Sequence, residues 1–425
     1  MIVEFMSGAE VTKVFESTAV NTFKLLDKPP VFMRGEGPWL YTDKDEQYLD
    51  LVCGSATSNL GHNHPEHIKA IKEVTKTGIF HTGTRLISPY RADLYQQLSD
   101  FMETPDISIH LSNSGSESIE TAIKITRFIT KRQRFISFEG GYHGRTLGAL
   151  SVTHSEKIKS PFIGKIGDFV TFVPFPRKET EVGFCLEKCS EIFEYYESIE
   201  EPIAGLIIEA VQGVSGVWGP WTSFLEGLED LAKKHGSLFI ADEIWSGLGR
   251  SGKKFSFNYS KISPDLVVLG KGLSSSTPLS AVIAKGDLLK SWTPGAHTST
   301  FQGNPISCAA ACATLKEIKH SSLLEHVNNS IEPCFYKLSK QLKNSGKVKT
   351  VRFVGAQCAI ELDNSKTSNL VQNIALQQEK MLTYGGGING ECVLILPPLN
   401  IDKDLLEKAL ETLTKIITEE LPKHS

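Results

Sequence analysis

The sequence predicts an α/β protein in which a large domain, built on a mostly parallel sheet between helices, is joined to a small α+β domain. The chain has 425 residues, enough for two or three domains at roughly 100–200 residues each. Hydrophobic residues make up 40% and charged residues 22%, as in ordinary globular proteins. The middle of the chain alternates short apolar segments with longer helix-like ones, the pattern of a parallel sheet covered by helices.

The alternating region supplies the elements of the large domain. Strands are expected at 134–138, 204–208, 237–241, 265–269 and 279–284. Helices are expected at 116–131, 184–198 and 223–235. Ligands of open α/β sheets bind outside the carboxyl ends of the strands. The residues that follow these strands are therefore the first place to look for chemistry.

Beyond about residue 311 the pattern changes to helices at 311–319 and 330–344, strands at 357–362 and 392–396, and a last helix at 403–419. Segments 38–41 and 47–51 resemble a hairpin, which gains stability if it pairs with the C-terminal part. We therefore expect an N-terminal segment (1–51) that joins the small domain, a large cofactor-binding domain (52–310) and a C-terminal small α+β domain (311–425).

Charge and hydropathy exclude several function classes. Lys and Arg total 45 against 49 Asp and Glu, a formal charge of −4, which is too balanced for a nucleic-acid-binding surface. The sequence contains no apolar run of about 18 residues and no secretory signal pattern, so no membrane partner is expected. We expect a cytoplasmic protein whose eight cysteines stay reduced and pack in the core.

The segment Ser112–Glu117 (SNSGSE) follows an apolar stretch and opens a well-patterned helix. Free N–H groups at a helix start, the helix dipole and small side chains suit a phosphate group. The alternative is a capping box, in which Ser114 and Glu117, three residues apart, satisfy backbone N–H groups. The segment alone does not decide between these two interpretations.

Two predicted strands end in charged residues. One ends in Asp242 and Glu243, which places a carboxylate where a parallel-sheet ligand binds. The next ends near Lys271, between two glycines; a lone lysine there is usually a solvated surface residue. Together, an anion site, an acid and a lysine are the groups that hold pyridoxal phosphate (PLP). The lysine forms a Schiff base, and the acid keeps the pyridine nitrogen protonated.

A series of motifs connects the chain to a known family. The chain contains, in this order, NSGSES, GGYHGRT, IIEAVQG, ADEIWSGLGRSG, VVLGKGLSSSTPLSAVI and HTSTFQGNP. Their order and approximate spacing resemble those of the class III PLP-dependent aminotransferases. The resemblance extends from GPWLYTDKDEQYLDL and NLGHNHP to ILPPLNI near residue 400. It implies fold type I, PLP as cofactor and a homodimer with shared active sites.

The resemblance also implies three catalytic residues. Lys271 would form the Schiff base with the cofactor and, once released by substrate, move the proton between the substrate carbon and the cofactor. Asp242 would pair with the pyridinium nitrogen and so keep the ring an electron sink. Glu209, in IIEAVQG, would belong to the polar surroundings behind the ring.

Cofactor-binding residues follow from the same resemblance. Gly115 and Ser116 would bind the phosphate through N–H groups and the Ser116 hydroxyl. Tyr142 would stack on one ring face, and Ile244 would pack on the other. Thr300 would reach the phosphate bound by the neighbouring subunit.

The chain departs from those relatives that act on ω-amino acids or ornithine with 2-oxoglutarate, which use two arginines and a gating glutamate. The first arginine matches Arg145, which can grip a carboxylate. Leu394 replaces the second, and Val214 replaces the glutamate. Ser55 stands where a bulky residue is frequent, and Trp245 where many relatives carry a glutamine that contacts the cofactor. We therefore expect one carboxylate clamp, a roomy apolar second region and weak use of dicarboxylates.

Other residues have spacings that suggest ligands. His62, His64 and His67 have a spacing found among metal ligands. The resemblance places them in a turn that enters a helix, so no metal site is expected. His143 either tunes the contact of its neighbour Tyr142 or has no role. Arg85 either replaces the missing charge or, as we favour, flanks a helix in solvent.

The leading functional hypothesis is an aminotransferase that moves an amino group from an ω-amino acid, diamine or related amine to a 2-oxoacid. The reaction would follow a ping-pong mechanism through Lys271. A racemase or epimerase of the same fold is the alternative, since GKGLSSSTPLSAVI and GNPIS also fit such relatives, although Arg145 favours transamination. A non-catalytic protein of this fold is the third hypothesis, and the intact Lys271 and Asp242 argue against it.

Overall fold

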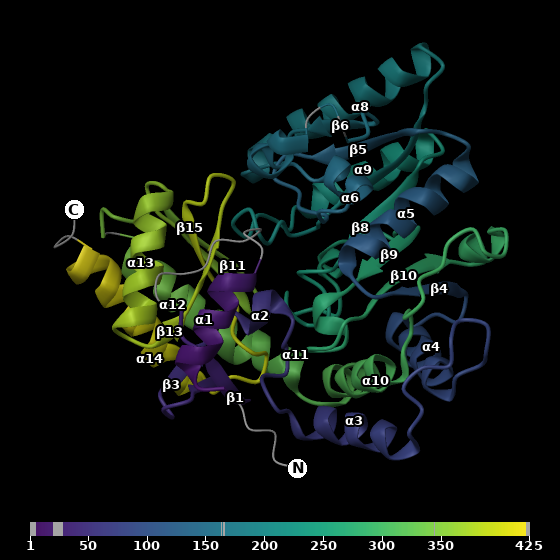
Figure 1. The fold of residues 1–425 in the computed structure, drawn as a ribbon. Coiled ribbons are helices and arrows are strands. Elements are labelled where there is room, and N and C mark those ends of the chain that lie inside the picture. Colours follow the sequence, from purple (N-terminus) through teal and green to yellow (C-terminus); the bar gives the residue numbers. More distant parts are fainter. Residues whose placement is uncertain (1–5, 20–28, 163, 165, 344, 422–425) are drawn as a thin grey trace.

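The computed structural model describes residues 6–19, 29–162, 164, 166–343 and 345–421. Figure 1 shows two parts side by side. One contains the elements from α3 to α10, and the other combines the first strands with the C-terminal helices and strands. No helix in the described ranges is long and apolar enough to cross a membrane.

A seven-stranded sheet with the order β4-β10-β9-β8-β7-β5-β6 forms the centre of the large part. Its strands are β4 Ile107–Ser112, β5 Arg134–Phe138, β6 Val170–Val173, β7 Ile203–Ile208, β8 Leu238–Asp242, β9 Leu266–Leu269 and β10 Ser280–Lys285. β10 runs antiparallel to both neighbours, and the pairs from β9 to β6 are parallel. The mostly parallel sheet is confirmed, and the five predicted strands lie within one residue of their expected ends.

Helices cover both faces of this sheet. In β8, Phe239 and Ala241 pack into the core shared with α8 and α9, whereas Ile240 packs into the core shared with α5. Burial on both faces explains the nearly continuous apolar runs of the strands. The helices of this part are α3 Pro65–Thr77, α4 Pro89–Met102, α5 Gly115–Thr130, α6 Leu147–Val152, α7 Glu156–Lys159, α8 Val182–Ser198, α9 Thr222–Lys234 and α10 Pro305–His320. The short helix α2 Cys53–Ala56 precedes them in the chain.

Helix α10 begins six residues before the expected start at 311. The Asn304 side chain accepts a hydrogen bond from Ser307 N (2.9 Å), and Pro305 occupies the first helical turn. Both features are typical of a helix start. The predicted domain boundary between 310 and 311 falls inside this helix. The domain limits themselves stay predictions.

The small part contains two four-stranded sheets. One has the order β11-β12-β15-β14, and its strands are β11 Thr350–Val354, β12 Gln357–Glu361, β14 Tyr384–Gly386 and β15 Cys392–Ile395. Its helices are α11 Leu323–His326, α12 Glu332–Leu342, α13 Ser365–Gln377 and α14 Lys403–Lys415, with π-helical turns at Val327–Ile331 and Ile416–Glu420. The two predicted strands and the predicted last helix are therefore present.

The other sheet joins the two ends of the chain, as the hairpin pattern predicts. It contains β1 Phe32–Glu36, β2 Trp39–Thr42, β3 Gln47–Asp50 and β13 Met381–Leu382. Helix α1 Gly8–Thr18 precedes β1 in the chain. β13 pairs with β3 in parallel, and Leu49 N donates to Lys380 O (2.8 Å). A hairpin from the start of the chain is thus completed by a strand from its last quarter.

Arg250 connects segments that lie far apart in the sequence. Its side chain is fully buried. Nη1 donates to Ala356 O (2.9 Å) and Pro397 O (2.5 Å), and Nη2 donates to Asn59 Oδ1 (2.7 Å). A buried guanidinium stabilises a fold only while its partners remain in place. Arg250 therefore holds the loop after β8 against the small part.

We expect Arg250→Met to lower the free energy of unfolding by about 3 kcal/mol, because three buried oxygen acceptors would lose their donor. Denaturant unfolding followed by circular dichroism measures this change. Lys253→Met, at an exposed position of the same loop, is the control and should stay within about 0.5 kcal/mol of the wild type. Equal stability of the two variants would contradict the role of Arg250.

Candidate active site

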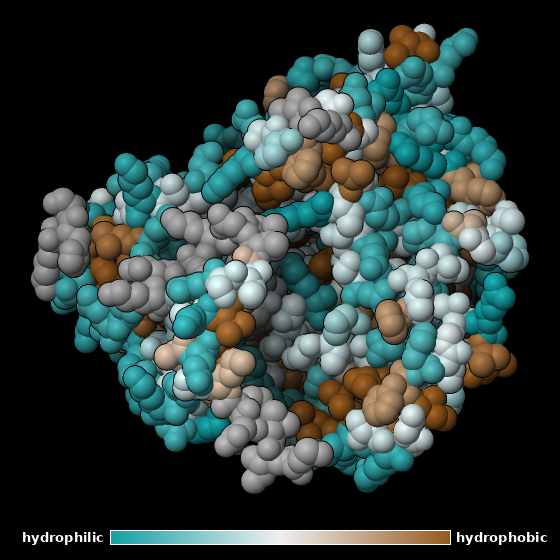
Figure 2. All heavy atoms as spheres, in the orientation of Figure 1, coloured by the Kyte–Doolittle hydropathy of each residue, from teal (hydrophilic) through white to brown (hydrophobic). Residues whose placement is uncertain are grey.

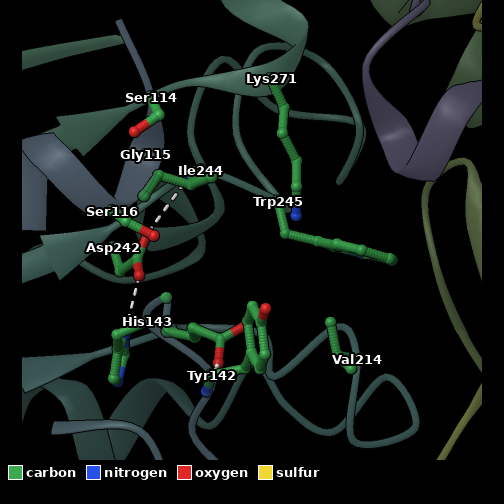
Figure 3. A pocket seen from close by; sticks show the side chains of 12 residues that line it. Ser114, Gly115, Ser116, Tyr142, His143, Val214, Asp242, Ile244, Trp245 and Lys271 are labelled. Atoms are coloured by element: carbon green, nitrogen blue, oxygen red, sulfur yellow. Dashed lines mark hydrogen bonds and ion pairs between the residues drawn. The ribbon is translucent and has the colours of Figure 1, made fainter. Parts of the chain in front are cut away.

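A cavity of about 190 Å³ opens at the carboxyl ends of three neighbouring strands. Glu209 directly follows β7, Asp242 ends β8, and Lys271 lies two residues beyond β9. Figure 3 shows these strand ends facing residues from other segments. The cavity is lined by Ser114, Gly115, Ser116, Tyr142, His143, Gly144, Glu209, Val214, Asp242, Ile244, Trp245 and Lys271.

Both carboxylate oxygens of Asp242 are held. His143 Nδ1 lies 2.7 Å from Asp242 Oδ2, and Ile244 N donates to Asp242 Oδ1 (3.0 Å). His143 is itself buried, and its backbone N–H donates to Thr153 Oγ1 (2.9 Å). Of the two interpretations of His143, the geometry therefore favours a role, but that role is to orient Asp242 rather than Tyr142. The GGYHGRT motif gave no signal of this partner.

Glu209 is buried beside this pair. Its Oε1 accepts a hydrogen bond from Tyr142 N (2.8 Å), and its Oε2 accepts one from Gly213 N (3.3 Å). Burial raises the pKa of Glu209 to about 7, and the charge of Asp242 adds to this, while His143 and the two N–H donors oppose it. Glu209 thus fixes the backbone at Tyr142 and at Gly213.

The Lys271 amine lies 4.0 Å from the centroid of the Trp245 ring. Burial lowers the pKa of Lys271 to about 8, although the charges of Asp242 and Glu209 act in the opposite direction. A lysine with this pKa keeps part of its population as the neutral amine near neutral pH. That form is the one able to attack a carbonyl carbon.

Ser114 caps α5, but the reciprocal bond of the predicted capping box is displaced by one residue, because Glu117 accepts from Asn113 N rather than from Ser114 N. Ser114 Oγ accepts a hydrogen bond from Glu117 N (3.3 Å), while Glu117 Oε2 accepts one from Asn113 N (2.8 Å). Gly115 and Ser116 at the start of α5 both line the cavity, so their N–H groups are candidates for binding an anion. A Cβ at Gly115 would lie 2.9 Å from Ile244 Cδ1, so the close packing here requires glycine.

These residues fit PLP. The start of α5 suits a phosphate, and Tyr142 and Ile244 approach the cavity from opposite sides, as two faces of a flat ring require (Figure 3). Asp242 lies between them and can accept a ring N–H, and Lys271 supplies the amine. Gly144 also lines the cavity, where a Cβ would collide with the Ser116 hydroxyl.

Three of the predicted site residues do not line this cavity. Arg145 is exposed at its edge, where Nε donates to the Tyr142 hydroxyl (3.0 Å) and the backbone N donates to Ser116 Oγ (3.3 Å). Ser55 is half-buried in α2, and Thr300 is exposed in the loop between β10 and α10. Arg85 is exposed in the segment before α4. The roles predicted for these residues stay predictions.

The three histidines with metal-like spacing have separate surroundings. His62 Nε2 lies 2.8 Å from Asp50 Oδ2, and His67 Nε2 lies 2.6 Å from Ser274 O. His64 is the residue before the first turn of α3. Their side chains do not converge on one point.

Comparisons with known proteins agree with this site. The sequence model of the family described as Aminotransferase class-III matches residues 26–417. The acetylornithine aminotransferase of Methanopyrus kandleri is 32% identical over 406 residues, covering 95% of this chain and 98% of that protein. The acetylornithine aminotransferase of Lactococcus lactis is 33% identical, covering 96% of this chain and 100% of that protein.

Two solved structures share the fold. One is the taurine:2-oxoglutarate aminotransferase of Bifidobacterium kashiwanohense in complex with PLP and glutamate, with a TM-score of 0.90, 24% identity and 99% of each chain covered. The other is an (S)-enantioselective omega-transaminase of Thermomicrobium roseum, with a TM-score of 0.89, 25% identity and coverage of 98% and 100%.

Together with the family match, this similarity over the whole length defines a PLP-dependent enzyme of fold type I, as the sequence predicts. The chain belongs to the class III aminotransferase family, so its cofactor is PLP and its reaction is transamination. The relatives and structures named here are described as aminotransferases or transaminases, which supports transamination over the racemase alternative.

We expect Lys271 of the apoprotein to react with a small amine-reactive reagent. The extent of its labelling should have a pH midpoint near 8, whereas an unperturbed lysine has a pKa of about 10.4. The neutral amine forms as the pH rises through the pKa, so labelling increases towards alkaline pH. Peptide mass spectrometry after reductive methylation measures this midpoint.

Glu209→Gln is the matched variant for this measurement. The Glu209 charge raises the pKa of Lys271, so its removal should move the midpoint below 8. The exposed Lys253 in the same digest controls for the reagent. A Lys271 midpoint at about 10 or higher would contradict the effect of burial.

Proposed function

We propose that the protein transfers an amino group from an ω-amino acid, a diamine or a related amine to a 2-oxoacid by a ping-pong mechanism through Lys271. One observation carries this proposal: the Lys271 amine, Asp242 and Glu209 meet in one cavity at adjacent strand ends. PLP, when bound, supplies the electron sink for the substrate carbanion. The other tasks fall to residues of the chain.

The proposed roles follow from the contacts in the cavity. Asp242, held by His143 and Ile244 N, keeps a proton on the ring nitrogen. The N–H groups of Gly115 and Ser116 and the Ser116 hydroxyl bind the phosphate. Tyr142 and Ile244 hold the ring between them, and Glu209 fixes the backbone at Tyr142. Thr300 completes the phosphate site of the neighbouring subunit.

Lys271 is proposed as the group that moves the proton at the substrate carbon. With a pKa of about 8, its amine can both accept and return a proton near neutral pH. Its surroundings contain two buried carboxyl groups, Asp242 and Glu209, whose charges oppose the loss of its proton.

The substrate side of the proposal uses one carboxylate clamp. Arg145 lies at the cavity edge beside the Tyr142 hydroxyl, and a guanidinium can bind a carboxylate with two hydrogen bonds. Leu394 and Val214, which stand where the resemblance places a second arginine and its gating glutamate in some relatives, belong to one apolar cluster. These residues support weak use of 2-oxoglutarate. Ser55, in place of a bulky residue, is proposed to leave room for the remainder of the donor.

The proposal includes a cytoplasmic homodimer. All eight cysteines are buried free thiols, which suits a reducing compartment. An exposed apolar patch is formed by Ile79, Phe80, Leu86, Ile87 and Phe301, and Figure 2 shows apolar side chains gathered over the region of α4 and α10. The His81 and Phe301 rings, 5.4 Å apart, connect this patch to the Thr300 loop. Such a patch is typical of a subunit interface.

A panel of amine donors tests the function. In the absence of any 2-oxoacid, a donor should convert the bound cofactor to its amine form and release a carbonyl product in an amount equal to the active sites. Pyruvate or another 2-oxoacid should then restore the starting absorbance. Ping-pong transamination predicts both half-reactions, whereas a racemase would release no carbonyl product and would incorporate solvent deuterium with inversion.

Lys271→Ala should lose turnover and the visible absorbance of the lysine-bound cofactor, because no other amine lines the cavity in the described part of the chain. Lys253→Ala, at an exposed position, is the control and should keep both. A Lys271→Ala variant that still transaminates would refute the assignment.

For the dimer, a Leu86→Asp/Ile87→Asp double variant should sediment as a monomer, because two carboxylates would be buried against apolar side chains. Sedimentation velocity measures the assembly state. Phe184→Asp, at an exposed apolar residue of α8, should leave the dimer intact. A monomeric wild type, or a dimeric double variant, would contradict this interface.

A further inference from the structure

The position of the Lys271 amine marks where the donor amine must arrive. This amine lies over the face of the Trp245 ring, 4.0 Å from its centroid. Figure 3 shows Trp245 and Val214 on the side of the cavity away from Asp242 and His143. Groups attached to the reacting carbon on this side must therefore contact the indole face.

The orientation of Trp245 is fixed by its surroundings. Only 6% of its surface is exposed. A Cβ at Gly213 would overlap Trp245 Cδ1 and Nε1, so the polar edge of the indole is turned towards the Gly213 backbone. Within the described residues, Nε1 has no hydrogen-bond partner. The apolar face, rather than the N–H group, is thus presented to the Lys271 amine.

Further apolar side chains pack against Trp245 and Val214. The Tyr384 ring lies 6.0 Å from the Trp245 ring, and Trp245, Tyr384, Val214 and Leu394 belong to one cluster. A Cβ at Gly386 would meet both Leu394 Cδ1 and the Val214 carbonyl oxygen, so these two residues lie next to one another. We call Trp245, Tyr384, Val214 and Leu394 the apolar wall.

Among the described residues, those that line the cavity supply no second cation beside Lys271. Arg352 on β11 is already engaged: Nη1 donates to Glu361 Oε2 (2.5 Å), Nε donates to Gly216 O (2.6 Å), and the guanidinium lies 3.7 Å from the Trp218 ring centroid. Arg145 lies at the cavity edge, where its Nε donates to the Tyr142 hydroxyl.

We infer that Trp245, supported by the rest of the apolar wall, is the specificity-determining residue of the site. It selects substrates in which the substituent next to the indole face is an uncharged alkyl or aryl group. The inference rests on the proposed function. An apolar substituent loses its contact with water against the indole face. A carboxylate or ammonium group would lose its hydration there without gaining a partner.

The test uses two pairs of ligands that differ only at the distal end. The acceptors 2-oxopentanoate and 2-oxoglutarate share the chain length and the oxoacid group, but a methyl in the first replaces a carboxylate in the second. With a common amine donor, the holoenzyme should show a kcat/KM at least about tenfold higher for 2-oxopentanoate. The unreactive pair pentanoate and glutarate should show the same preference in dissociation constants from calorimetry.

Variants at position 245 assign the preference to the indole. Trp245→Gln should reduce both ratios by about tenfold, because it replaces the ring with a polar side chain. Trp245→Phe should keep both ratios within about threefold of the wild type, because an aromatic face remains. Circular dichroism shows whether each variant is folded, and the ratios are compared only between folded variants.

The outcomes separate the two proposals. Equal use of the two acceptors, or equal binding of pentanoate and glutarate, would overturn the apolar wall while transamination stands. Ratios unaffected by Trp245→Gln would overturn the role of Trp245. Absence of turnover with every donor and acceptor would overturn the proposed function, whereas the calorimetric ratio would still report on the wall.

Discussion

The parallel alignment of β7, β8 and β9 is the constraint on which the site depends. Because these strands run in one direction, their carboxyl ends meet at one sheet edge, and Glu209, Asp242 and Lys271 are brought into one cavity. Three ionisable groups buried together would be costly without compensation. The cost is offset by His143 at Asp242 and by two backbone N–H donors at Glu209. The remaining cost of burial lowers the pKa of Lys271 to about 8 and raises the pKa of Glu209 to about 7.

Next to these ionisable groups, the substrate side of the proposed site is apolar. In the proposed site, Gly115, Ser116 and Asp242 bind the cofactor as the family resemblance implies, while Trp245, Val214 and Leu394 stand where the resemblance implies polar or charged residues. These three side chains lie in one apolar cluster although they come from three separate segments. They pack together, so their effects on substrate choice are expected to be coupled. A fold shared with relatives therefore does not imply a shared substrate.

The interior of the fold was the most predictable part. β5 and β7–β10 lie in the centre of the large sheet, where burial on both faces produces unbroken apolar runs. β6 and β11 lie at sheet edges and are only partly buried along most of their length, so their sequences resemble loops. The start of α10 was missed because Asn304 and Pro305 were assigned to a motif rather than to a helix cap. Predictions therefore failed where exposure weakens the apolar pattern.

The sequence by itself determined which chemical groups stand at the strand ends, because the position of Asp242 or Lys271 after an apolar run depends only on local order. Only the tertiary structure decided how those groups are paired and what faces them. It brings His143 to Asp242, lays the Trp245 ring under the Lys271 amine, and leaves Arg145, Ser55 and Thr300 outside the cavity of this chain. Contacts between distant segments depend on the path of the whole chain and on side-chain rotamers. Neither is encoded in the spacing of a motif.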